Sequence, residues 1–416
     1  MAVAGVSIGR FRRRLEPLLS GLGLGVREVH RGLLRAVMVG LLRFPSSYVS
    51  ELARGLGEEF GPSLSAREHR LLRFLASPKL SLERLKATHR RLLASALPPE
   101  GRVFLFADLS DLAKPHARTM AGLDWVRDGS NPGSEKRIVR GYWLNEVYVE
   151  LGPGRVAPAV FEIYSLRSGH TLSQTHVLLR GMDEAFEVVG PRGVWVADRG
   201  FDDGNMFDAL LCRNRDFIIR LQVGSNARNL LLANGSRATV TTLLRMLPLP
   251  EMLYSDRDLR RMGRLGWTRV RLPDHGERVL TLVVVHMRGH TDPMAVLTTL
   301  PVPDAGAARR VVAAYLRRWG GAEDPVRFIK QTFRLERFLV ASLRAMRVWV
   351  FLIGVAMALL VLLLDPRSVG RRLARSVECF SNQVLFLGYR LARALADLLQ
   401  GLSPARYRRL LLASGP

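Results

Sequence analysis

The chain has 416 residues, which is enough for roughly two or three domains with buried cores. Its hydrophobic content of 48% is ordinary for a globular protein and excludes a wholly disordered chain. Lys and Arg number 62 against 37 Asp and Glu, a formal net charge of +25, so the surface must attract polyanions and nucleic acid is the leading partner.

The cysteine content and the N-terminal segment bear on the compartment. Cys212 and Cys379 are the two cysteines, and their distant, unrelated contexts argue against a disulfide framework or a cysteine-based zinc site. The first residues contain no long apolar stretch followed by a cleavage site, so we expect no secretory signal. Together these features predict a cytoplasmic protein.

One apolar segment, residues 348–364, is uncharged and almost long enough to cross a membrane. Arginines flank both of its ends, so the positive charge gives no inside-outside asymmetry. We therefore expect a buried core helix and no membrane partner. A membrane-anchored protein is the alternative, and cell fractionation would separate the two.

Residues 1–98 have leucines spaced at three and four residues among many arginines, as in AREHRLLRFLA, which predicts amphipathic helices with outward arginines. A Pro-Pro-Glu-Gly stretch at 98–101 ends this pattern. The next segment, RVFLFADLS, predicts a buried strand that ends at Asp108. Further strands are expected at 142–152 and 155–165.

A helix over roughly 171–189 and then the strand VWVAD, which ends at Asp198, continue the pattern. Another helix and the strand DFIIRLQV follow, so the order of elements predicts an α/β fold with a mixed sheet flanked by helices. Short alternating runs over 224–290 predict a β-rich insertion. After it we expect a further strand, MAVLTTL, and a helix that contains YLRRW and IKQ.

Two carboxylates at the ends of buried strands suggest a chemistry. Cleavage of a phosphodiester bond uses two divalent cations, which stabilise the attacking and the leaving oxygen. Magnesium prefers oxygen ligands, so the protein must bring several carboxylates together. A single such Asp is more often a helix cap or a turn former, but Asp108 and Asp198 within this order of elements favour the functional interpretation.

Three sequence blocks then resemble a known family, the DDE transposases of bacterial insertion sequences, in the branch with a Tyr-Arg-Glu-Lys signature. The resemblance extends over residues 104–335. FADLSDLAKPHARTM is similar to the first-acid block of the family, and VWVADRGFD to the second. The third block consists of Tyr315, Arg318, Glu323 and Lys330.

This resemblance implies a ribonuclease-H-like catalytic domain and strand cleavage and transfer at transposon ends. It implies that Asp108, Asp198 and Glu323 form the catalytic, metal-binding triad for two Mg²⁺ ions, with Mn²⁺ as a substitute. Tyr315, Arg318 and Lys330 would contact the DNA end. The implied partners are double-stranded DNA, as terminal inverted repeats and target, and a second copy of the chain in a homodimer assembled on DNA.

The third block departs from the family, which places Glu four residues after Arg, where this sequence has Ala322. On an unbroken helix the extra residue would rotate Glu323 by about 100°. Gly320-Gly321 can absorb it as a bulge or break, and Asp324-Pro325 can restart the helix as cap and first position. Asp324 is the competing metal ligand.

The expected domains combine the pattern with the resemblance. Residues 1–98 form a helical, Arg-rich DNA-binding region; 99–223 and 291–365 form the catalytic domain; 224–290 form the β-rich insertion; and 366–416 form a helical C-terminal region. Two alternatives in function are a non-catalytic DNA-binding protein derived from a transposase, which the shifted Glu323 favours, and a nuclease on the same fold.

Overall fold

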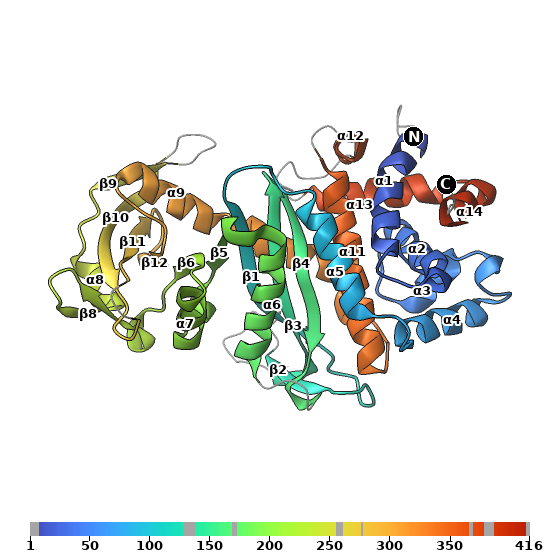
Figure 1. Ribbon diagram of the computed structural model, residues 1–416, viewed down its shortest axis with the longest axis horizontal. Helices are drawn as coiled ribbons and strands as arrows, with labels where there is room; N and C mark the ends of the chain where they lie inside the picture. Colours follow the sequence, from blue (N-terminus) through green and yellow to red (C-terminus); the bar gives the residue numbers. More distant parts are fainter. Residues whose placement is uncertain are drawn as a thin grey trace. The chain divides into compact units, whose positions relative to one another are not determined.

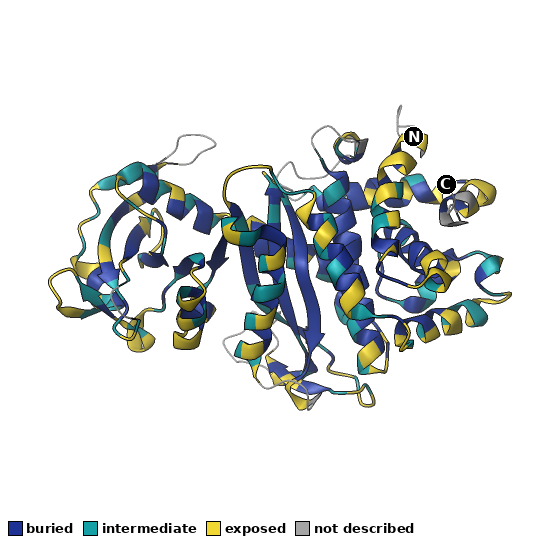
Figure 2. Cartoon of the chain, viewed as in Figure 1, coloured by how far each residue is buried: buried dark blue, intermediate teal, exposed yellow. Residues whose placement is uncertain are grey.

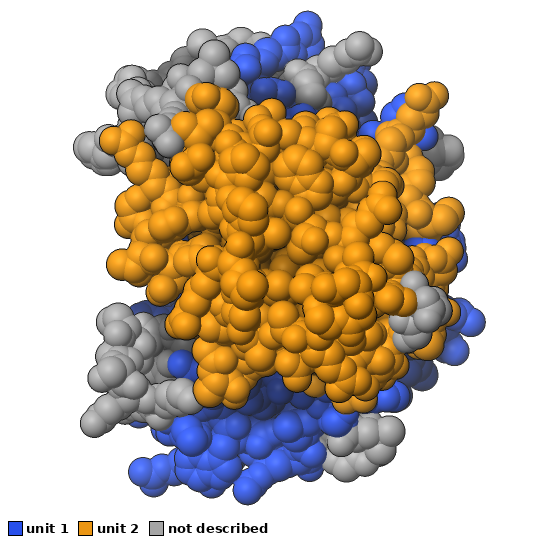
Figure 3. Space-filling model, turned by 90° about the vertical axis from the view of Figure 1, so that its left-hand side faces the viewer, with its two compact units in different colours: residues 1–99, 109–189, 322–416 blue, residues 100–108, 190–321 orange. Residues whose placement is uncertain are grey.

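The computed structural model describes residues 8–127, 138–168, 173–254, 261–275, 278–365, 369–377 and 387–412. The chain divides into two units (Figure 3). Unit 1 comprises residues 1–99, 109–189 and 322–416, and unit 2 comprises residues 100–108 and 190–321. The polypeptide therefore leaves and re-enters each unit, and the division does not follow the order of the sequence.

The N-terminal part of unit 1 is helical (Figure 1), as the leucine spacing predicts. Its helices are α1 (Ile8–Gly23), α2 (Glu28–Arg43), α3 (Val49–Gly55), α4 (Leu64–Ala76) and α5 (Leu82–Ala94). Serines fix two of the helix starts: the Ser63 side chain accepts a hydrogen bond from Ala66 N, and Ser81 accepts one from Arg84 N. The arginines of α1 at positions 10 and 12–14 are exposed, while Phe11 and Leu15 are buried.

The C-terminal part of unit 1 is also helical, with one helix in its core. The helices are α10 (Asp324–Thr332), α11 (Leu343–Leu363), α12 (Val369–Ser376), α13 (Gly388–Gln400) and α14 (Pro404–Leu412). In length and composition α11 could cross a membrane, but 89% of its most apolar window is buried in the protein. It packs against β4, α2, α4 and α13, as the core-helix interpretation predicts. Figure 2 shows how burial is distributed over the helices and strands.

Three strands of unit 1, β2 (Asp124–Arg127), β3 (Ile138–Gly152) and β4 (Arg155–Tyr164), are antiparallel neighbours. Gly152 and Gly154 have positive φ angles at the β3–β4 turn, where a side chain would be strained. Helix α6 (Gln174–Val189) packs on the face of Asn145, because Gly181 approaches that side chain. Helix α11 packs on the other face of the sheet, against Phe161, whose cross-strand partner is Glu146, the chain neighbour of Asn145.

Strand β1 (Val103–Ala113) belongs to both units. Its first half pairs in parallel with β5 (Gly193–Ala197), and β3 is its other neighbour. The prediction that the strand ends at Asp108 is wrong. The strand continues because its second half stays paired on the β3 side, where the Leu112 carbonyl lies against Gly141 and Lys114 N donates to Arg140 O at 2.7 Å.

Unit 2 extends the sheet from β5. Beyond β5 the strand order is β6 (Asp216–Arg220), β12 (Met294–Thr298), β11 (Leu280–Met287), β10 (Arg261–Arg271), β7 (Asn229–Leu232) and β8 (Arg237–Thr239), with β9 (Glu251–Tyr254) on β10. The helices are α7 (Gly204–Cys212), α8 (Val240–Met246) and α9 (Ala305–Leu316). Strands β7 to β11 confirm the expected β-rich insertion, and its strand β11 joins the sheet through β12.

The predicted fold class is confirmed: α/β, with a mixed sheet flanked by helices and with helical N- and C-terminal regions. The strands β4, β3, β1, β5 and β6 are neighbours in that order. Strand β1 is parallel to β5 and β5 to β6, whereas β3 and β4 are antiparallel. This is the arrangement expected of a ribonuclease-H-like sheet, and it places the ends of β1 and β5 at the same edge.

Candidate active site

Asp108 and Asp198 occupy matching positions on two neighbouring parallel strands of unit 2. The last β1–β5 pair is Phe106 with Val196, and each aspartate follows its paired residue by two positions. Because side chains two residues apart point to the same face, both carboxylates project from one side of the sheet at the same height. The parallel register therefore brings the first two predicted acids together.

The carboxylate of Asp198 is oriented by the turn that follows β5. Its Oδ1 accepts a hydrogen bond from Gly200 N at 2.8 Å, at the start of the short 3-10 turn Arg199–Phe201. A Cβ at Gly200 would stand 3.0 Å from Oδ1, so glycine keeps this approach open. One oxygen is thus held by the backbone, and the carboxylate has a fixed orientation before any ligand binds.

Arg318 bridges the two aspartates. Its Nη1 lies 3.7 Å from Asp108 Oδ2, and its Nη2 lies 3.9 Å from Asp198 Oδ2. The guanidinium side chain is 11% exposed, against 24% for Asp108 and 35% for Asp198. A cationic group therefore lies beside both carboxylates, so the two negative charges attract positive charge to the same position.

A π-helix, Trp319–Glu323, follows Arg318 directly. A π-helix holds one more residue per turn than the surrounding α-helix can, so it is where an inserted residue is taken up. It includes both glycines of the predicted bulge and the extra residue Ala322. The departure from the family spacing is therefore accommodated inside the helix, as the glycine pair predicts.

The start of this π-helix packs against the strand that carries the first acid. A Cβ on Gly321 would lie 2.4 Å from the ring of Phe106, so only glycine permits this contact within unit 2. Phe106 precedes Asp108 by two residues and shares its face of β1. The chain thus crosses the acid-bearing face of the strand two residues before Glu323.

Glu323 is the last residue of the π-helix, and α10 begins at Asp324 with Pro325 in its first turn. Asp324 is not the helix cap that the sequence suggests. Its side chain instead lies 3.8 Å from Arg327, one turn further along α10. The reason is that the π-helix runs into α10 without a break, so no residue there adopts the extended conformation of a cap.

The three predicted acids come from both units, Asp108 and Asp198 from unit 2 and Glu323 from unit 1. Within the described ranges, no three His, Cys, Asp or Glu side chains gather as a ready metal-binding group. The carboxylate pair nevertheless suits a hard cation, because it supplies oxygen ligands and attracts the positive charge of Arg318. The assignment of Glu323 as third ligand stays a prediction.

The other two predicted DNA-contacting residues have different surroundings. Tyr315 is only 5% exposed, which agrees with a packed core position, the alternative to a DNA contact. Lys330, on α10, lies 3.1 Å from Glu336. It lines a surface hollow in unit 1 together with Gln331, Arg334, Glu336 and Arg337. Three cationic side chains in one hollow can receive a phosphate.

Lys114, in the first-acid block, holds the turn that contains Glu336. It is 6% exposed, and its Nζ donates hydrogen bonds to the carbonyl oxygens of Glu336 and Phe338, at 2.5 and 2.9 Å. The ammonium also lies 3.7 Å from the centre of the Phe338 ring. Burial lowers the pKa of Lys114 to about 7, although the negative charge of Glu336 partly opposes this shift.

This lowered pKa predicts a pH-dependent stability. Between pH 7 and 10 the unfolded chain binds the Lys114 proton and the folded protein releases it, so stability rises with pH in this window. The unfolding free energy of the wild type minus that of Lys114→Met should increase by up to about 1.4 kcal/mol for each pH unit in this window. Urea unfolding at pH 7 and pH 9 measures this difference. The same difference in unfolding free energy at pH 7 and at pH 9 would contradict the prediction. Lys79→Met, at an exposed lysine, serves as the control.

Residues near the second acid divide into two roles. Asp203 caps α7 by accepting a hydrogen bond from Met206 N. Its neighbour Asp202 does not cap this helix: it accepts a hydrogen bond from Gln222 N at 2.7 Å and forms a close ion pair with Arg228. Nothing in the sequence signals these distant partners. Cys212 is a free, exposed thiol, and Cys379 lies outside the described residues.

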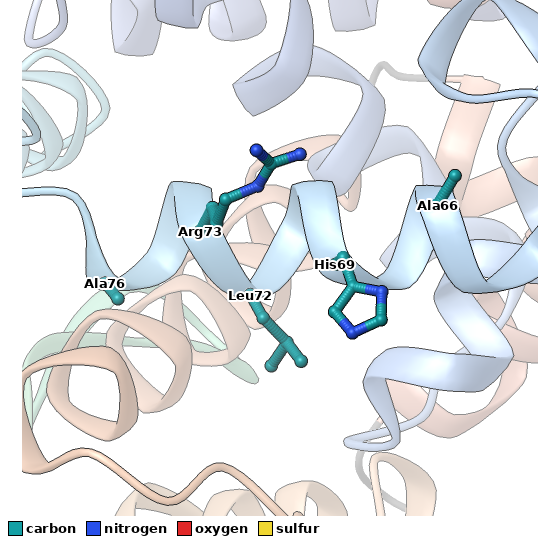
Figure 4. Close-up of a pocket in the computed structure, with 5 residues that line it drawn as sticks. All are labelled: Ala66, His69, Leu72, Arg73 and Ala76. Carbon is teal, nitrogen blue, oxygen red and sulfur yellow. The ribbon is translucent and has the colours of Figure 1, made fainter.

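A separate surface hollow runs along α4 (Figure 4). Its lining residues are Ala66, His69, Leu72, Arg73 and Ala76, which all lie on that helix. None of them is a carboxylate, so the hollow lacks the ligands that divalent-metal chemistry requires. The candidate active site remains the carboxylate pair on β1 and β5.

Comparisons with known proteins find one matching family model. Residues 159–361 match the family model described as Transposase DDE domain. The matched range extends from β4 into α11 and includes Asp198, Arg318 and Glu323, while Asp108 precedes it. A comparison with curated proteins finds no match.

Among solved structures, the chain is similar to a piggyBac transposase in a synaptic complex with hairpin DNA. The sequences are 10% identical, the TM-score is 0.44, and the alignment covers 97% of this chain and 83% of the other. The central region of the chain, residues 159–361, is thus similar to the transposase DDE domain.

Proposed function

We propose that the chain is a DDE transposase of the insertion-sequence type, which cleaves DNA strands at transposon ends and transfers them to target DNA. The observation that supports this most strongly is the register of β1 and β5, which sets Asp108 beside Asp198 on one face of the sheet. The match to a transposase DDE domain covers the second of these acids. Proteins with this domain generally use divalent metal ions.

In the proposed mechanism Asp108, Asp198 and Glu323 hold the metal ions. Two Mg²⁺ ions, or Mn²⁺ in their place, would supply activation of the attacking oxygen and stabilisation of the leaving oxygen. The backbone of Gly200 keeps the Asp198 carboxylate oriented throughout. Arg318 and Lys330 would neutralise phosphates beside the cleaved bond. Tyr315, the third residue that the resemblance assigns to the DNA end, is 5% exposed and would support its helix from the core.

The basic surface supports the proposed partner. A net charge of +25 favours double-stranded DNA, both as terminal inverted repeats and as target, and the exposed arginines of α1 fit a DNA-binding role for residues 1–98. We further propose a homodimer assembled on DNA and a cytoplasmic, DNA-associated location.

The experiment that tests this function incubates the full chain with a duplex carrying the DNA that flanks its coding region. We expect strand cleavage in Mg²⁺ or Mn²⁺ and no cleavage in EDTA. Joining of the cleaved strand to a target separates a transposase from a nuclease on the same fold. DNA binding without cleavage in either metal would instead identify a non-catalytic relative.

The bridging position of Arg318 predicts how the protein alone binds a metal ion. The guanidinium competes with any cation for the two carboxylates, so Arg318→Gln should bind Mn²⁺ more tightly in the absence of DNA. Removing one positive charge about 4 Å from two partly exposed carboxylates should raise the affinity by about fivefold to tenfold. Titration of the electron paramagnetic resonance signal of free Mn²⁺ measures this change.

Arg317 provides the matched control for this prediction. Its guanidinium lies 4.4 Å from the centre of the Phe104 ring, so Arg317→Gln removes the same charge one residue away. This control should change Mn²⁺ affinity much less. Equal or weaker affinity in Arg318→Gln would show that the guanidinium does not compete with a metal ion.

A further inference from the structure

One edge of unit 1 has an outward face that combines an aromatic ring with arginines. In β2, Asp124 and Val126 are buried while Trp125 and Arg127 are exposed. The antiparallel register pairs Trp125 with Arg140 and Arg127 with Ile138 of β3. Cross-strand partners share a face of the sheet, so these four side chains form one surface, the Trp125 face.

The indole of Trp125 is held in place without being buried. The Arg140 guanidinium lies 4.4 Å from the ring centre, which is the distance of a cation–π contact. Trp125 is nevertheless 49% exposed, and its neighbour Ile138 is 65% exposed. An aromatic ring that stays half exposed to water contributes little to folding stability. Such rings are frequent where proteins bind partners.

Among the described residues of β2 and the start of β3, the charges exposed on the Trp125 face have one sign. In the paired stretches 124–127 and 138–141 the single carboxylate is Asp124, which is 8% exposed. Its two oxygens accept hydrogen bonds from Trp125 N at 2.8 Å and Leu166 N at 2.9 Å, so it faces the protein backbone. Arg167, whose side chain is 55% exposed, lies 4.0 Å from Asp124 and compensates its charge.

We propose that the Trp125 face binds unpaired nucleotides of DNA, with a base stacked on Trp125 and the adjoining phosphates held by Arg127 and Arg140. Stacking on an aromatic ring next to cationic side chains is how proteins bind single strands without reading their sequence. A base inside a duplex already stacks on its neighbours and would leave the indole uncovered. The inference rests on the proposed function, because strand cleavage at a DNA end is what exposes unpaired nucleotides.

The test compares the full-length wild type with Trp125→Ala by fluorescence anisotropy, using a labelled single strand and a duplex of the same sequence. Trp125→Ala should weaken single-strand binding by about fivefold to a hundredfold and change duplex binding less than about twofold. Trp125→Phe should retain most of the affinity, because it keeps an aromatic face. Met246→Ala, at an apolar residue of α8 that is 73% exposed, is the control for truncation of a surface side chain.

The arginines are tested separately through salt dependence. Arg140→Gln should reduce the slope of log affinity against log salt by about 0.7 for the single strand, the value for one phosphate contact. Unchanged single-strand binding in Trp125→Ala, or equal losses for single strand and duplex, would overturn the proposal. A change in the sedimentation of the DNA-free protein in Trp125→Ala would overturn it in favour of a contact between two copies.

This experiment is independent of catalysis. Binding is measured in EDTA, and an Asp108→Asn protein should bind the single strand as the wild type does. If the wild type fails to cleave DNA and Trp125 still governs single-strand binding, the proposed function fails and the proposed binding site stands. If cleavage occurs and Trp125→Ala binds normally, the reverse holds.

Discussion

Asp198→Asn and Asp108→Asn should each lower metal-dependent strand cleavage by about a thousandfold or more, because each removes the charge of a metal ligand from the carboxylate pair. Asparagine keeps the shape of the side chain, and its oxygen at position 198 can still accept the hydrogen bond from Gly200 N. DNA binding should stay within about threefold of the wild type, since neither aspartate contacts phosphate. Cleavage of an end-labelled duplex and anisotropy of the same duplex measure the two effects.

Asp203→Asn is the matched control for this prediction. Asp203 lies five residues after Asp198 but caps α7, and asparagine caps a helix about as well as aspartate. Its cleavage rate should therefore match that of the wild type. Cleavage by Asp108→Asn or Asp198→Asn at the rate of Asp203→Asn would remove that residue from the active site.

The second large effect is expected at the end of the π-helix. If Glu323 is the third metal ligand, as we propose, Glu323→Gln should abolish cleavage as completely as the aspartate variants; the π-helix takes up the extra residue that separates Glu323 from Arg318. Asp324→Asn should leave cleavage intact. It loses only the ion pair with Arg327, two side chains on the surface of one helix, which contributes about 0.3 kcal/mol.

Comparison of the two variants decides between the neighbouring acids. Cleavage rates and urea midpoints should be measured for both proteins, so that a folding defect is recognised. If Asp324→Asn loses activity and Glu323→Gln retains it, Asp324 is the third ligand. If both variants cleave normally, the site functions with the two aspartates alone and the triad assignment is wrong.

The strands that carry the candidate site could be predicted because each is a buried apolar run, and burial in a central sheet selects such residues. The run VWVAD predicted a strand that ends at Asp198, and β5 ends one residue earlier, at Ala197, with Asp198 capping the turn that follows. The end of β1 could not be predicted in this way. Its second half, from Leu109 to Ala113, mixes polar and apolar residues and becomes a strand because β3 supplies its hydrogen-bond partners.

The contacts of the charged side chains could not be predicted from the sequence pattern. The bridge from Arg318 to both aspartates joins residues separated by more than a hundred positions, and no local spacing indicates it. Strand β2 was missed for a related reason. Its four residues alternate between buried and exposed and carry two charges, so the strand forms only through its pairing with β3. The face proposed for unpaired DNA thus appears in the structure alone.

The central claim is that Asp108, Asp198 and Glu323 together hold the metal ions that cleave DNA. Its most direct test is a crystal structure of the protein with a DNA end and Mn²⁺, in which anomalous scattering locates the manganese. The account predicts manganese within about 2.2 Å of carboxylate oxygens from all three residues, the distance typical of oxygen ligands to small divalent cations. Manganese bound elsewhere, or bound by Asp324 with Glu323 turned away, would contradict it.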